Sequence, residues 1–177
     1  MSRTSAELDA VRSECLNLLV AHYVYRKTFE EMKLGEADRF ELLRWIVTLR
    51  ILENDLILRL CRLDDDEKTN HSFREAVRSL EKTIPQTEVQ ELHARLKTFR
   101  QSINPIKTKA RNFFVAHLSK SADVPFLPEG GLGSLVLEAV AIVDALAGSA
   151  VQYSFSVGSQ EKPLDLRLEL SDASAQR

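Results

Sequence analysis

Arg111 and His117 are the two side chains in this sequence best suited to chemistry on a phosphate. They stand six residues apart in KARNFFVAHLSK, residues 109–120, with Asn112 directly after the arginine. Histidine titrates near neutral pH and can move protons, whereas arginine keeps its charge and can hold the negative charge that builds on phosphorus. Asn112 adds a neutral hydrogen-bonding group. Metal-independent cleavage of RNA would need groups of these types.

A basic window surrounds this pair on a chain whose net charge is −2. Between Glu91 and Asp123 there are seven lysines and arginines and no acidic residue. Such a window can steer a polyanion to one face of the molecule, and Lys107, Lys109 and Lys120 are predicted to bind flanking phosphates. The alternative is a solvated helix face whose charges pair with acidic helices nearby.

The spacing of the pair constrains its geometry. Residues six apart on a regular helix are about 120° apart around the axis and roughly 9 Å apart along it. His117 continues an apolar seam through Phe113, so Arg111 points elsewhere. A two-fold dimer would bring two histidines and two arginines into one cleft. On spacing alone, the favoured interpretation is a core histidine beside a surface arginine.

The elements that position the pair are predicted to be helices. Apolar residues at steps of three and four predict helices over about 4–34, 36–63, 72–82 and 85–119, and a small-sided helix from about 132. Thr4 with Glu7 and Ser72 with Glu75 are predicted capping boxes. Pro105 predicts a kink or a break before a re-aimed segment 105–119. The small-sided helix predicts either the bundle's centre or a subunit contact.

The C-terminal region has two interpretations. Residues 151–157 and 164–170 alternate apolar and polar, which is compatible with a hairpin. The favoured alternative extends the last helix to about 157, followed by a loose tail with 164–170 as a short edge strand. We therefore predict an all-α, up-and-down bundle of about five helices with a possible short C-terminal strand. It forms a single domain over 1–177, with its core over about 5–157 and a tail over 158–177.

Three further groups of residues carry expectations. The 36–63 helix is apolar on more than one side and is expected to be central. Arg50 and Asn54 interrupt its second stripe, where they could form a structural network or line the cleft beneath the motif. Asp64–Asp66 is expected to be a solvated loop, since its spacing does not suit a metal. Cys15 and Cys61 are expected to be reduced core residues. No metal or cofactor is predicted. No secretory or membrane segment is predicted either, so the expected location is cytoplasmic.

The stretch ARNFFVAHLSK resembles the signature of the HEPN superfamily, in which a polar residue follows an arginine and four to six positions separate the arginine from a histidine. Five positions lie between Arg111 and His117. ILRLCRLDDD followed by a short helix resembles the abortive-infection branch of that family, and the similarity extends over about residues 5–157. The resemblance implies an all-α homodimer. It also implies a metal-independent endoribonuclease, used as a toxin or in phage defence, that leaves a 2′,3′-cyclic phosphate and a 5′-hydroxyl. His117 would act in acid–base catalysis, and Arg111 would orient and stabilise the phosphate.

The resemblance leaves two functional hypotheses. The first is a homodimeric ribonuclease with a composite Arg111, Asn112 and His117 site, RNA as substrate, and a possible cognate antitoxin or defence protein as partner. The second is a non-catalytic HEPN module that binds RNA, a nucleotide or a partner protein, because other members have lost catalysis.

Overall fold

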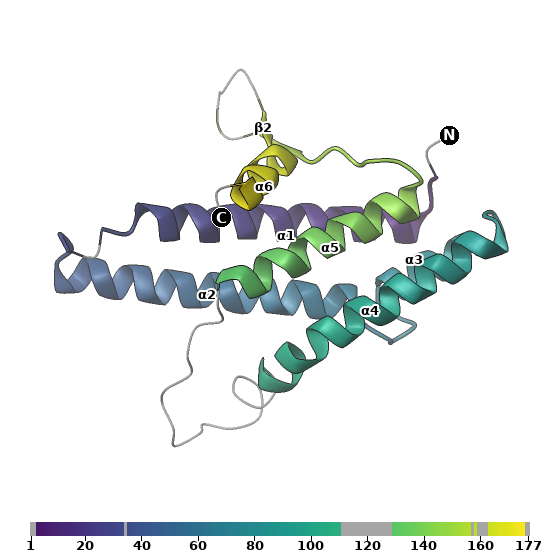
Figure 1. Ribbon diagram of the computed structural model, residues 1–177, viewed down its shortest axis with the longest axis horizontal. Helices are drawn as coiled ribbons and strands as arrows, with labels where there is room; N and C mark the ends of the chain where they lie inside the picture. Colours follow the sequence, from purple (N-terminus) through teal and green to yellow (C-terminus); the bar gives the residue numbers. More distant parts are fainter. Residues whose placement is uncertain (1–2, 34, 111–128, 157, 159–162, 176–177) are drawn as a thin grey trace.

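A computed structural model describes residues 3–33, 35–110, 129–156, 158 and 163–175 of the chain (Figure 1). In this part of the chain there are six α-helices and one small antiparallel sheet. In order they are α1 Ala6–Glu31, α2 Arg39–Leu63, α3 Phe73–Leu80, α4 Gln86–Ala110, α5 Glu129–Ala147, β1 Ser154–Phe155, β2 Leu164–Asp165 and α6 Leu166–Ala175. The predicted all-α class is confirmed.

Helices α1 and α2 form a long antiparallel hairpin (Figure 1). The N-cap of α1 is Ser5, whose Oγ accepts a hydrogen bond from the backbone N–H of Leu8 at 3.1 Å, so the cap predicted at Thr4 is off by one residue. A capping box of Asp38 and Glu41 starts α2. Because both helices carry apolar residues at steps of three and four, they bury one continuous seam between them.

Helix α5 lies at the centre of the bundle. It contacts α1, α2, α3 and α4, as its small side chains allow, so the bundle-centre alternative is confirmed. At its start, a Cβ built on Gly133 would come within 3.6 Å of His22 Nε2 of α1. Helix α3 joins the bundle through an edge-to-face contact between Phe73 and Phe99 of α4, with ring centroids 5.5 Å apart.

Helix α4 continues through Pro105 to Ala110. Of the two alternatives predicted at this proline, a kink or a break, the break is therefore wrong. Pro105 lacks the N–H that would reach the Gln101 carbonyl, but both residues are exposed. Water can satisfy that carbonyl, so the helix tolerates the proline.

The C-terminal region differs from its favoured prediction. Helix α5 ends at Ala147 and does not run on to 157, since Gly148 adopts a positive φ of 70°. The two-residue strands β1 and β2 form a short hairpin in which Ser154 pairs with Asp165. Helix α6 takes the place of most of the predicted edge strand. Leu166 and Leu170 are buried on this helix, which contacts α1, so this part of the tail is docked.

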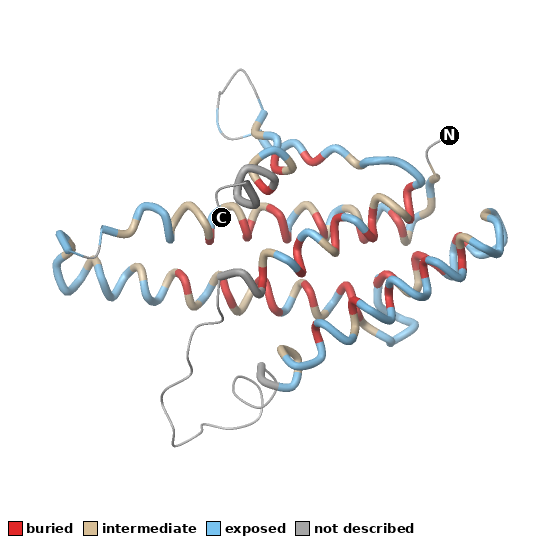
Figure 2. The backbone as a smooth tube through the Cα atoms, viewed as in Figure 1, coloured by how far each residue is buried: buried red, intermediate tan, exposed pale blue. Residues whose placement is uncertain are grey.

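The N-terminal half of α2 is not central, contrary to prediction. Figure 2 shows much of this half exposed or half-buried. On its core-facing side Leu49 is buried, whereas Leu42 and Ile46 are 38% and 42% exposed, and an outer stripe of five large apolar side chains is exposed as well. This outer stripe consists of Phe40, Leu43, Val47, Ile51 and Leu58. Helix α2 is apolar on two sides, as predicted, but no described element covers the outer stripe.

None of the described helices has the length and apolarity that a membrane crossing requires.

Candidate functional site

Helix α4 carries the chain to the predicted catalytic residues. Its described part ends at Ala110, one residue before Arg111. Arg111, Asn112, His117 and Lys120 lie outside the described residues, as does the side chain of Lys109. The described contacts therefore define how the chain approaches the motif.

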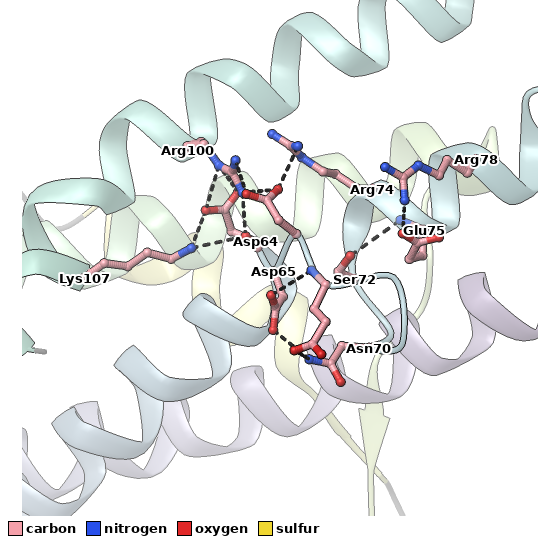
Figure 3. A network of polar contacts seen from close by, with 11 residues as sticks. Asp64, Asp65, Asn70, Ser72, Arg74, Glu75, Arg78, Arg100 and Lys107 are labelled. Carbon is pink, nitrogen blue, oxygen red and sulfur yellow. Dashed lines mark hydrogen bonds and ion pairs between the residues drawn. The ribbon is translucent and has the colours of Figure 1, made fainter. Parts of the chain in front are cut away.

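Asp64, the C-cap residue of α2, ties α2 to α4 (Figure 3). Its carboxylate accepts a hydrogen bond from Lys107 Nζ at 2.6 Å and one from Arg100 Nε at 3.2 Å. Its backbone carbonyl accepts from Arg100 Nη2 at 2.9 Å and from Lys107 Nζ at 3.2 Å. Asp64 is only 5% exposed, so the expectation of a solvated acidic loop is wrong for this residue. A buried carboxylate requires such partners.

Asp66 adds a second, more exposed pair to the same arginine. Arg100 holds its carboxylate with two hydrogen bonds of 2.6 Å, and Arg74 of α3 contacts it at 2.7 Å. The hydrogen bond from Arg100, helped by its charge, lowers the pKa of Asp66 and raises that of Arg100. We call Asp64, Asp66, Arg100 and Lys107 the α2–α4 clamp.

The third carboxylate of the run shapes the loop between α2 and α3. Asp65 accepts hydrogen bonds from the Glu67 backbone N–H at 3.1 Å and from Asn70 Nδ2 at 2.9 Å, and the first of these is the main cause of its lowered pKa. The three aspartates therefore turn to different partners. Among the described residues, no group of three or more His, Cys, Asp or Glu side chains gathers as a metal site would need.

The clamp changes the electrostatic picture of the basic window. Lys107, predicted to bind phosphate, is half-buried and paired with Asp64, and Arg100 is paired with two aspartates. For Lys107 and Arg100, the alternative prediction that basic residues of this window pair with acidic neighbours agrees with the observed contacts. Arg95 and Lys97 in the same window are exposed.

Arg50 and Asn54 lie one turn apart on α2, as predicted, and Arg50 has an acidic partner that the sequence analysis missed. Arg50 Nη1 lies 2.8 Å from Glu53 Oε2, and Glu53 is only 1% exposed. The half-buried Asn54 has a buried Oδ1 without a hydrogen-bond partner among the described residues. A buried carboxylate and an unsatisfied amide on one helix make this a polar segment within an apolar bundle.

His22 is buried on α1 against the start of α5. Burial, helped by the charge of Arg26, lowers its pKa to about 4. It is thus a neutral core histidine at physiological pH, as its place on the apolar seam indicates.

An open hollow of about 350 Å³ lies between α4 and α5. Its lining includes Arg95 of the basic window and Glu138 of α5. The opposite charges of these two residues leave the hollow without the uniformly positive lining that a phosphate chain favours.

Comparison with known protein families shows to which family the chain belongs. The family model HEPN_AbiU2, described as AbiU2, matches residues 1–164. The chain belongs to the AbiU2 family of HEPN proteins. No curated protein and no solved structure matches it.

The AbiU2 match confirms the resemblance on which the sequence analysis relied. It spans the helices from α1 to α5 and includes the motif, whereas α6 lies beyond its end. In this AbiU2 chain, the sequence located the motif but missed Asp64 and Glu53. The i, i+3 spacing of Arg50 and Glu53 is a signal that could have revealed one pair. Asp64 has no comparable local signal, because its partners are 36 and 43 residues away.

Proposed function

We propose that this AbiU2-family protein is a homodimeric, metal-independent endoribonuclease that acts in phage defence or in a toxin–antitoxin system. Arg111, Asn112 and His117 of both subunits form the site, RNA is the substrate, and the cytoplasm is the place of action. The observation that carries the proposal is the Arg111-to-His117 motif in a chain that belongs to a HEPN family.

The proposed reaction is an internal transesterification. One histidine takes the proton of the ribose 2′-hydroxyl, the 2′-oxygen bonds to phosphorus, and the bond from phosphorus to the 5′-oxygen breaks. A second histidine protonates the leaving 5′-oxygen. Arg111 holds the extra charge on the phosphoryl oxygens in the transition state. The products are a 2′,3′-cyclic phosphate and a 5′-hydroxyl, with atoms and protons conserved.

Two described features support this proposal. The α2–α4 clamp fixes α4 up to Lys107, four residues before Arg111, and such support keeps catalytic groups in register. The exposed cations Arg95 and Lys97 lie on the same helix and can attract RNA.

The test is cleavage of diverse single-stranded RNAs in the presence of EDTA. Wild type should yield fragments with cyclic phosphate ends, and His117→Ala and Arg111→Ala should each reduce cleavage at least ~100-fold. His93→Ala, which removes an exposed histidine on α4, is the matched control and should cleave as wild type does. Equal inertness of wild type and His117→Ala would refute the enzymatic proposal.

The second candidate function is a non-catalytic HEPN module that binds RNA, a nucleotide or a partner such as an antitoxin or defence protein. The observation that favours it is the clamp, because Arg100 and Lys107 form ion pairs with Asp64 and Asp66 and are therefore less available to bind RNA phosphates. For this candidate, RNA binding without cleavage, unchanged in His117→Ala, is the expected result.

A further inference from the structure

The outer stripe of α2 is an apolar surface on the side of the helix that faces away from the core. At 100° per residue, its five residues fall within about 80° of one another. The buried residues Leu49, Leu56 and Leu60 cluster on the opposite side. Phe40 is 72% exposed and Ile51 is 61% exposed. A helix that is apolar on two opposite sides is normally buried on both, so the outer stripe needs a partner.

The spacing of the outer stripe suits a second helix. Its residues follow one another at steps of three, four, four and seven, and the stripe runs for about 27 Å. Four of its five residues are also placed symmetrically about Leu49, whereas the counterpart of Leu43 is Asp55. Phe40 and Leu58 lie nine residues on either side, and Val47 and Ile51 lie two on either side. Two antiparallel copies of α2 related by a two-fold axis would therefore set Phe40 against Leu58 and Val47 against Ile51.

The charges beside the stripe favour the same arrangement. Arg44 and Asp55 lie on the same flank, five and six residues from the centre. Arg44 is exposed and has no ion pair among the described residues. Asp55 is partly exposed and uses Oδ2 for Arg59 at 2.8 Å. The antiparallel two-fold brings Arg44 of each copy within about one residue of Asp55 of the other on the same flank, whereas in a parallel pair these two residues would lie about 16 Å apart along the helix axis.

We propose that α2 pairs antiparallel with α2 of a second copy of this chain, with the outer stripe as its apolar seam and two Arg44–Asp55 contacts on one flank. The proposal deepens the homodimer of the proposed function by assigning its surface and register, and it rests on that function only for the presence of a dimer. It requires no catalysis.

The first test measures molar mass in solution by light scattering and sedimentation over a range of protein concentrations. Wild type should be a dimer. Val47→Lys with Ile51→Lys puts like charges across the seam and should weaken the dimer at least 100-fold. Val47→Lys with Ile51→Glu puts opposite charges across it and should restore the dimer. Leu168→Lys, an equally exposed change on α6, is the control and should stay dimeric. Circular dichroism shows that each variant is folded.

The second test examines the flank. Arg44→Asp alone should weaken the dimer, and Arg44→Asp combined with Asp55→Arg should recover it. A monomeric wild type would overturn the proposal and assign the stripe to a different protein. A Val47→Lys, Ile51→Lys variant as dimeric as wild type would overturn it too. His117→Ala should remain dimeric, so an inert dimer contradicts only the proposed function. An active dimer that Val47→Lys with Ile51→Lys leaves intact contradicts only this inference.

Discussion

Lys107 Nζ of α4 lies 2.6 Å from Oδ2 of Asp64, the residue that caps the C-terminus of α2. The same carboxylate also accepts a hydrogen bond from Arg100. One buried aspartate thus holds two cations that are seven residues apart on α4. This relationship links the end of α2 to the segment that leads into the motif.

Asp64→Asn should destabilise the fold by about 2–3 kcal/mol, because it removes the charge that both cations share in a buried setting. Urea unfolding measures this as a lower midpoint with an unchanged slope. Asp66→Asn is the matched control: its carboxylate is 55% exposed, so the loss should stay below about 1 kcal/mol. Equal losses for the two variants would show that burial of Asp64 has no energetic effect.

His22 should make the fold sensitive to acid. Its folded pKa of about 4 lies below the ordinary 6.5, so the unfolded chain takes up the proton first. The stability due to neutral His22 is complete above pH 6.5 and is lost as pH falls toward 4, by up to about 3 kcal/mol. His22→Leu should reduce the dependence of the free energy of unfolding on pH between pH 6.5 and 4.5. His93→Gln, which replaces an exposed histidine, should leave that dependence unchanged. A His22→Leu variant with the wild-type pH dependence would contradict this assignment.

Both cysteines should react slowly with thiol reagents in the folded protein. Burial raises the pKa of the Cys15 thiol to about 12, and burial is also the main cause of the raised pKa of Cys61. At pH 8, Cys15 should react about 1000-fold more slowly than in urea. The half-buried Cys61 should react before the fully buried Cys15. Cys61→Ser should remove the faster phase; loss of the slower phase instead would reverse the assignment.

Arg167→Leu should loosen α6. Arg167 binds both carboxylate oxygens of Asp144 at 2.9 Å and the Val151 carbonyl at 3.0 Å, which fastens α6 to the end of α5. We expect a loss of about 1–2 kcal/mol and faster proteolytic cleavage after residue 148. Arg62→Leu, which removes an exposed arginine 3.8 Å from Glu14, should change neither quantity. Equal protease resistance of wild type and Arg167→Leu would contradict the anchoring role.

Local sequence patterns predicted the helices well where one side of each is buried. The seam that starts at Leu8 and the cap at Ser72 located α1 and α3, because both signals act within a turn or two. In the C-terminal region the favoured prediction was wrong, since 164–170 alternates like a strand but is mostly helical, whereas the alternative hairpin is present as the short β1–β2 pair. Its helix is held by Arg167 reaching Asp144, which is 23 residues away and leaves no local pattern.

The candidate site was predictable only in part. The spacing of Arg111 and His117 located the motif, and the family match agrees with the resemblance it carries. The role of Asp64 was not predictable, because an acidic run after a helix usually marks a solvated loop. Only the folded arrangement reveals that Arg100 and Lys107 reach it.

The clamp also bears on the mechanics of α4. Arg100 and Lys107 are held on either side of Pro105, where the helix lacks one backbone hydrogen bond. Because both side chains bind Asp64, they stabilise the helix across the position where its backbone hydrogen bond is missing. Because Asp64 is buried, salt screens its pairs with Arg100 and Lys107 only weakly, so the stiffness of α4 just ahead of the motif should persist at ionic strengths that weaken RNA attraction.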